Sequence, residues 1–92
     1  MEKDLRSFIK KIFDEYSEYD LYHYINGAFV DDTEIYIKSN KDNEVVNFIC
    51  DRAYELDIDY YDNKNKYGYD KAYSILIDDI NNLKKEAIKL LD

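Results

Sequence analysis

The chain has 92 residues, 37% of them charged, and a formal net charge of −8 at pH 7. This length fits a single domain, residues 1–92, and an apolar fraction of 46% is too high for a disordered chain. The negative charge disfavours direct binding to nucleic acid, because phosphates repel such a surface. One cysteine excludes an intramolecular disulfide, and no segment approaches the ~18 apolar residues of a membrane span, so we expect a cytoplasmic protein.

Residues 4–17 have the pattern of an amphipathic helix. Asp4 lies at its start, where the helix dipole favours an anion. Apolar side chains recur at the spacing that places them on one face, namely Leu5, Phe8, Ile9, Ile12, Phe13 and Tyr16. The pattern predicts a helix that packs on a core.

The following region is rich in β-forming side chains, and we predict strands in residues 21–25, 28–30 and 33–38. Asn26-Gly27 is a strong hairpin signal, and Asp31-Asp32 is a second candidate turn. The chain would form either a three-stranded meander that turns at both sites or a two-stranded hairpin that turns at Asp31-Asp32 with Gly27 in a bulge. The alternative is that the first helix continues to residue 25 and ends at Asn26-Gly27, but the β-formers favour strands.

Two further helices are predicted in the C-terminal half. Residues 43–56 hold one helical stripe, and residues 70–91 hold a longer and wider one. Residues 57–70, which are acidic and rich in tyrosine with Asn and Lys in the middle, are predicted to form a loop, and a short strand at residues 58–60 is the alternative. The width of the last stripe indicates packing against both the sheet and another helix, or against a second copy of the chain.

These elements predict a small α+β fold. It would comprise an N-terminal helix, a β-hairpin or short three-stranded antiparallel meander, and then two helices packed on one face of the sheet.

No pattern of catalytic or metal-binding residues is recognisable. His23 is the sole histidine, and Cys50 lies beside an apolar helical stripe without an activating partner in sequence other than Arg52. Asp57-Ile-Asp59 begins like a calcium loop, but the glycine and glutamate that such a loop requires are absent. We therefore predict a protein that is not an enzyme and has no cofactor or metal.

The feature that points to function is an acidic, tyrosine-rich stretch, residues 12–37, which contains no Lys or Arg. Such a surface favours a basic partner protein, and tyrosine is frequent among residues that contribute strongly to binding. The candidate partner-binding residues are Asp14, Glu15, Glu18, Tyr19, Asp20, Tyr22, Asp31, Asp32, Glu34 and Tyr36. About half of the tyrosines in this stretch are expected to lie in the core.

In size, charge and lack of catalytic motifs, the chain is similar to phage-encoded anti-CRISPR proteins and other nucleic-acid mimics. That likeness covers composition and size only. It implies a non-enzymatic inhibitor that occupies the basic nucleic-acid-binding site of a target protein, since closely spaced carboxylates can imitate the charge of a phosphate backbone.

Two other functions fit the same observations. One is an immunity protein or antitoxin that neutralises a basic nuclease toxin. The other is a structural or regulatory module that forms a homodimer through its C-terminal helix, in which case the acidic residues serve solubility alone.

Overall fold

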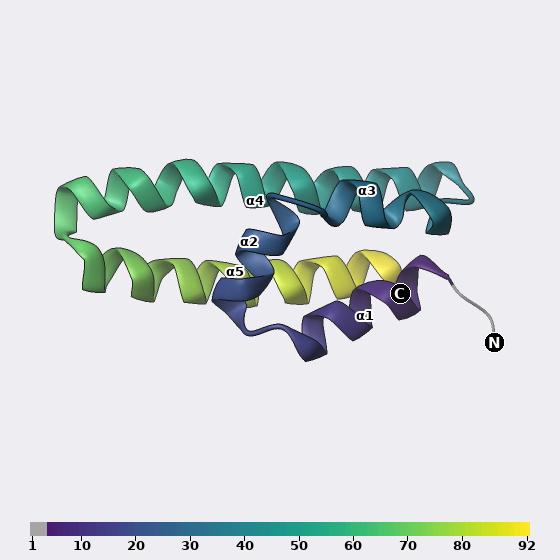
Figure 1. The fold of residues 1–92 in the computed structure, drawn as a ribbon, viewed down its shortest axis with the longest axis horizontal. Helices are drawn as coiled ribbons and strands as arrows, with labels where there is room; N and C mark the ends of the chain where they lie inside the picture. The colour runs from purple at the N-terminus through teal and green to yellow at the C-terminus, as the bar shows by residue number, and fades with distance from the viewer. Residues whose placement is uncertain (1–3) are drawn as a thin grey trace.

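The computed structural model describes residues 4–92, which are helical and contain no strand. In chain order the elements are α1 (Leu5–Glu15), α2 (Glu18–Ile25), α3 (Phe29–Thr33), the 3₁₀ turn η1 (Glu34–Tyr36), α4 (Asn40–Tyr67) and α5 (Tyr69–Leu91). The two longest helices, α4 and α5, run antiparallel and form a hairpin along the long axis of the molecule (Figure 1). The described part extends 45 × 22 × 22 Å.

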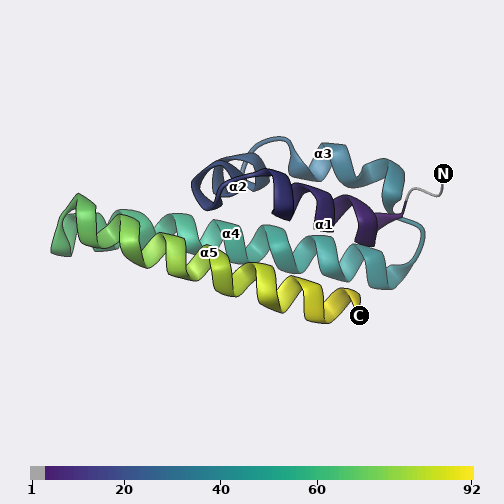
Figure 2. The same ribbon diagram turned by 90° about the horizontal axis from the view of Figure 1, so that it is seen from below.

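The short helices form a second layer on one face of this hairpin. Seen after a 90° turn, α1, α2 and α3 all lie on the same side of α4 and α5 (Figure 2). In Figure 1, α2 crosses both long helices, and α1 lies beside the C-terminal half of α5, antiparallel to it. The molecule is therefore a two-layer helical protein in which the hairpin is the platform.

The hairpin begins and turns at residues suited to those positions. Ser39 caps the start of α4, where its hydroxyl accepts a hydrogen bond from the backbone N–H of Asp42 at 3.1 Å. Gly68 alone separates α4 from α5, and its φ of +88° is a backbone conformation that residues other than glycine rarely adopt. One residue is thus enough to reverse the chain.

Both layers contribute to one hydrophobic core. From the hairpin, the inward faces of α4 and α5 supply Val45, Val46, Ile49, Ala53, Leu56, Tyr60, Ala72, Leu76, Ile80, Leu83 and Ala87. The short helices add Leu5, Ile9, Ile12, Phe13, Leu21, Tyr22, Ile25 and Phe29. Thr33 is also fully buried, and its hydroxyl donates to the carbonyl of Val30 at 2.8 Å.

The predicted α+β fold is wrong, because residues 4–92 contain neither a β-hairpin nor a sheet. Residues 21–25 belong to α2, whose buried side chains Leu21, Tyr22 and Ile25 share one helical face. The alternative, a first helix that continues to Asn26-Gly27, is correct in its end only. Asn26 is the C-cap, and its side-chain amide donates to the carbonyl of Tyr22 at 3.2 Å, but α1 ends at Glu15 and a separate helix begins after its own N-cap, Ser17. Burial of an apolar face has outweighed the preference of these residues for strands.

The other two predicted strands are also helical. Phe29 and Thr33, four residues apart, are the buried positions of α3, and η1 follows directly. A strand over residues 33–38 would place Ile35 on its apolar face, but in the structure Ile35 is 74% exposed. Only one face of the short helix α3 is covered, so burial here does not follow the alternation of buried and exposed residues that a strand would show.

The predicted loop over residues 57–70 is wrong as well, because α4 continues without interruption to Tyr67. Tyr60 extends the buried face one turn beyond Leu56, and Asp57 accepts a hydrogen bond from the hydroxyl of Tyr22 on α2. These two contacts stabilise the helical conformation of the tyrosine-rich segment. Helices were predicted correctly for α1 and α5, with ends that differ by one or two residues.

Candidate protein-binding surface

The structure distributes the ten sequence-predicted residues over several environments. Six of the acidic residues are exposed, namely Asp14, Glu15, Asp20, Asp31, Asp32 and Glu34. Partly buried are Glu18, Tyr19 and Tyr36, while Tyr22 is only 4% exposed. The carboxylates of α2, α3 and η1 therefore remain available to a partner, whereas the tyrosines mostly serve the fold.

Tyr22 joins α2 to α4. Its hydroxyl donates a hydrogen bond to the half-buried carboxylate of Asp57, and its ring lies 6.4 Å from that of Tyr60, centroid to centroid. Burial, together with the hydrogen bond to Asp57, raises the pKa of Tyr22 well above that of an ordinary phenol. The side chain is part of the core and presents little surface to a partner.

Two further tyrosines hold the short helices together. The hydroxyl of Tyr24 on α2 donates to the carboxylate of Asp32 on α3 at 2.6 Å, and burial followed by this bond raises the pKa of Tyr24. Tyr36 stacks on Phe8 of α1, with ring centroids 4.6 Å apart and planes at 17°. Asp32 and Tyr36 thus have structural contacts within the chain.

Tyr19 belongs to an aromatic cluster between α2 and α5. Its ring lies 4.5 Å from that of His23 and 5.5 Å from that of Tyr73, and Tyr73 in turn stacks on Tyr69 at 5.8 Å. His23 is exposed, and its ring makes a T-shaped contact with the ring of Tyr19. The cluster forms a continuous aromatic surface leading to the hairpin turn.

A second acidic surface lies on α4 and was missed from the sequence. Its carboxylates are all exposed and follow one another at spacings of seven, four, four and three residues: Glu44, Asp51, Glu55, Asp59 and Asp62. At 100° per residue these positions fall within a stripe about 80° wide, and a four-residue step advances about 6 Å along the axis. We call these five residues the α4 acidic face.

An exposed apolar row borders the α4 acidic face. Tyr54, Ile58 and Tyr61 follow at helical spacing and are 63%, 46% and 57% exposed. Large apolar side chains that lie exposed in a row are uncommon on an isolated protein surface and are typical of contact sites. Acid and aromatic side chains therefore combine on this helix in the way that the sequence predicted for residues 12–37.

Few cations compensate these carboxylates. Arg52 forms an ion pair with Glu55 at 2.7 Å, and its charge also acts on Asp79 of α5. Burial and the nearby Asp59 and Asp78 nevertheless raise the pKa of Asp79 above its usual value. Near the turn, the ammonium groups of Lys66 and Lys71 lie 5.2 and 5.0 Å from the ring centroid of Tyr67, so the acidic surface ends there.

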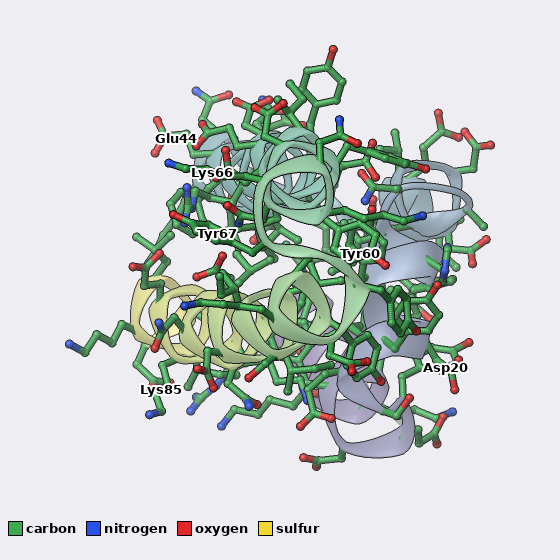
Figure 3. All side chains as sticks on the ribbon, turned by 90° about the vertical axis from the view of Figure 1, so that its left-hand side faces the viewer. Asp20, Glu44, Tyr60, Lys66, Tyr67 and Lys85 are labelled. Atoms are coloured by element: carbon green, nitrogen blue, oxygen red, sulfur yellow. The ribbon has the colours of Figure 1, made fainter. Side chains whose placement is uncertain are left out.

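The acids of the short helices and those of α4 do not form a single face. Viewed from the hairpin turn, Asp20 and Glu44 lie on different sides of the molecule (Figure 3). Asp14 is separated again, because it lines a groove with lysines of α1 and α5. The signal for the α4 acidic face was present in the spacing of the carboxylates, but two of the five, Asp59 and Asp62, lie in the segment that was predicted to be a loop.

Within the described residues there is little that resembles a catalytic or metal centre. No group of three or more His, Cys, Asp or Glu side chains in residues 4–92 is arranged to hold a metal ion. Cys50 is half-buried, and burial raises the pKa of its thiol, which disfavours the reactive thiolate.

Comparison with protein-family models, with curated proteins and with solved structures finds no match to this chain. Among the helices of residues 4–92, none combines the length and the apolar character needed to cross a bilayer.

Proposed function

We propose that this protein is a non-enzymatic inhibitor that binds the basic nucleic-acid-binding site of a target protein through the α4 acidic face. The observation that carries the proposal is the combination of five exposed carboxylates with the exposed row Tyr54, Ile58 and Tyr61 on one helix. The proposal places the protein in the cytoplasm, where such targets act.

Charge spacing supports this type of partner. Successive carboxylates of the α4 acidic face are about 5–10 Å apart along the helix axis, so most neighbours lie within the ~8 Å Debye length of physiological salt. Their fields therefore add, and they would attract a groove of Lys and Arg side chains that ordinarily holds phosphates. Long-range attraction of this kind increases the association rate and the selectivity for basic partners.

The exposed row supports a protein partner rather than a small cation. Charges at the rim of an interface contribute modestly to affinity, whereas buried aromatic side chains frequently dominate it. Tyr54 and Tyr61 lie beside the carboxylates, so both would be covered when a partner engages the acidic face. The rigid helix fixes their positions before binding, which lowers the entropic cost of association.

The first test is identification of the target. Tagged protein is exposed to a cell lysate, eluted in steps of increasing salt, and the eluted proteins are identified. We expect a basic nucleic-acid-binding protein that is also released by its own nucleic acid. Recovery of only untagged copies of this chain, or of proteins that nucleic acid does not displace, would contradict the proposal.

The second test locates the surface with two matched charge reversals. The triple variant Glu55→Lys, Asp59→Lys, Asp62→Lys alters the α4 acidic face. The triple variant Asp31→Lys, Asp32→Lys, Glu34→Lys makes the same change of net charge on α3 and η1. Circular dichroism establishes that both variants fold.

We expect the first variant to weaken target binding at least tenfold and the second to weaken it less than threefold, measured by titration at fixed salt. Equal losses would indicate attraction by net charge alone. A loss confined to the second variant would move the binding surface to the α3 region.

A further inference from the structure

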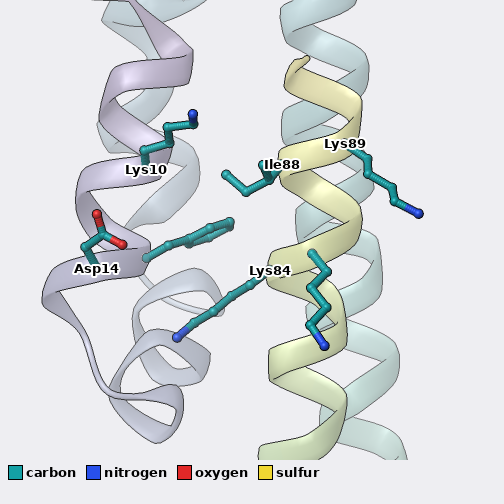
Figure 4. Close-up of a pocket in the computed structure, with 7 residues that line it drawn as sticks. Lys10, Asp14, Lys84, Ile88 and Lys89 are labelled. Atoms are coloured by element: carbon teal, nitrogen blue, oxygen red, sulfur yellow. The ribbon is translucent and has the colours of Figure 1, made fainter.

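The second feature that calls for explanation is a lysine-rimmed groove between α1 and α5, far from the hairpin turn. Its volume is about 770 Å³, within the range of small-molecule sites. The rim carries Lys10 from α1 and Lys84, Lys85 and Lys89 from α5, and the floor includes the apolar side chains Phe13 and Ile88. In Figure 4, Ile88 extends from α5 into the space between the helices, and Lys10 borders that space from α1.

The antiparallel course of the two helices explains where this groove lies. An ion pair between Arg6 and Asp92, at 2.6 Å, joins the first turn of α1 to the end of α5. One turn further along α1 comes Lys10, which faces the region of Ile88 and Lys89. Phe13 is only 7% exposed and Ile88 is half-buried, so the floor is apolar and shielded, whereas the rim reaches water.

Charge in the groove is opposite to that of the whole protein. Four lysines and a single carboxylate, that of Asp14, line the groove in a chain whose net charge is −8, and the ammonium group of Lys89 points away from α1 (Figure 4). Long lysine side chains can lay their methylene stems along an apolar floor while the charged ends remain in water. The groove therefore offers apolar contact below and positive charge around it.

We propose that this groove binds a small amphiphilic anion, of the class of medium- or long-chain fatty carboxylates, with the tail along Phe13 and Ile88 and the carboxylate among the lysines. This site is distinct from the α4 acidic face, so the proposal goes beyond the proposed function. The lysines would hold the headgroup by charge-assisted hydrogen bonds, and tail burial would supply the rest of the affinity.

The overall charge decides between this ligand and larger anions. A polyanion such as nucleic acid, or the acidic face of a second copy of the chain, would be repelled by the whole field of the −8 protein as it approached. A ligand with one negative charge is repelled far less and still gains the local attraction of the lysines. The apolar floor, in turn, favours a tail over a simple inorganic anion.

The experiment is a titration of ¹⁵N-labelled protein with sodium decanoate below its micellar concentration, followed by two-dimensional NMR. We expect the largest shifts in residues 10–14 and 84–89. Hexanoate and octanoate test the tail, and affinity should increase about twofold per added methylene, compared with about fourfold for complete burial, because the groove covers only one side. Acetate should produce no localised shifts.

Two matched triple variants test the lysines. Lys10→Gln, Lys84→Gln, Lys85→Gln removes charge from the rim, and we expect at least tenfold weaker decanoate binding. Lys64→Gln, Lys66→Gln, Lys71→Gln makes the same change of net charge at the hairpin turn, at the other end of the molecule, and should change binding less than twofold.

Three outcomes would overturn the proposal. Equal losses in the two variants would mean that net charge alone attracts the anion. Affinity that does not depend on tail length would remove the role of the apolar floor. Binding to vesicles of anionic lipid without any binding of monomeric decanoate would assign the lysines to a membrane surface.

Discussion

The hairpin and the layer packed on it are built from helices of very different length. The hairpin consists of helices of 28 and 23 residues, whereas α1, α2 and α3 have 11, 8 and 5 residues. In water, isolated helices shorter than ~12–15 residues are marginal, so the short ones depend on burial against the hairpin. In this protein the hairpin is therefore the platform, and the short helices depend on it for their conformation.

A pair of core truncations tests this dependence and should have the largest effects. Ile80 in α5 and Phe29 in α3 are both fully buried. Ile80→Ala should lower the free energy of unfolding by about 2–5 kcal/mol, because it leaves a cavity in the platform on which everything packs. Phe29→Ala should release mainly the short helices, which can open without unfolding the hairpin.

Hydrogen exchange distinguishes the two variants, with urea denaturation as the measure of overall stability. For Ile80→Ala, protection should fall throughout the described chain. For Phe29→Ala, it should fall most over residues 18–36, while the buried turns of α4 and α5 keep most of theirs. If Phe29→Ala lowered protection uniformly, the two layers would be a single cooperative unit.

The hydrogen bond between Tyr22 and Asp57 connects the two regions, and its removal should have an intermediate effect. Tyr22→Phe leaves the half-buried carboxylate of Asp57 without its donor and should cost about 1.5–3 kcal/mol, measured by urea denaturation at pH 7. The matched control is Tyr24→Phe, whose partner Asp32 is exposed and can bond to water instead, so its loss should be smaller.

The same pair gives a pH dependence. The pKa of Tyr22 is raised by burial and by its bond to Asp57, so the unfolded chain loses this proton at lower pH than the folded protein does. The stability of the wild type should therefore be fully present below about pH 10, the ordinary pKa of tyrosine, and decrease above it. In Tyr22→Phe that decrease should be less steep, and an unchanged slope would contradict the assignment.

Within the hairpin, Asp79 should give the smallest effect, and one of opposite sign. Burial raises the pKa of this carboxyl, although Arg52 partly opposes the shift, so its ionised form is disfavoured in the folded state. Asp79→Asn should therefore raise the melting temperature at pH 7, by only about 1–3 °C because solvent screens the site. The gain should vanish as the pH falls through the pKa of Asp79, while Asp78→Asn on the exposed side serves as the control.

The difference between the two regions also explains which parts of the structure were predictable. In α1 and α5 the apolar residues recur over several turns, so the helical period was visible in the sequence. In α2 and α3 only two or three buried residues define the face, and the strand preference of Tyr22, Tyr24 and Val30 outweighed them. Their helical form depends on contacts with α4 and α5, which local sequence does not contain.

The acidic and aromatic residues of the α4 surface were not identified from the sequence. Acidic residues combined with tyrosines were recognised in residues 12–37, yet Tyr22 lies in the core and Tyr36 stacks on Phe8. The corresponding combination on α4 depends on the helix continuing past Leu56, where Asn and Lys residues suggested a loop. Because contacts of Tyr60 and Asp57 extend the helix, Asp59 and Asp62 lie on the same helical face as the other carboxylates of the α4 acidic face.

The order of the two regions along the chain has a consequence for synthesis on the ribosome. The short helices are made first, but the hairpin against which they pack is complete only after α5 has been made. At translation rates of 5–20 residues per second, Leu21 and Ile25 would wait on the order of 3 to 13 seconds for their binding surface. The hairpin, closed by Gly68 alone, brings neighbouring segments together and should fold rapidly once made. We therefore expect the nascent N-terminal segment to expose apolar side chains until the last helix emerges, and to be the part of this protein most dependent on chaperones.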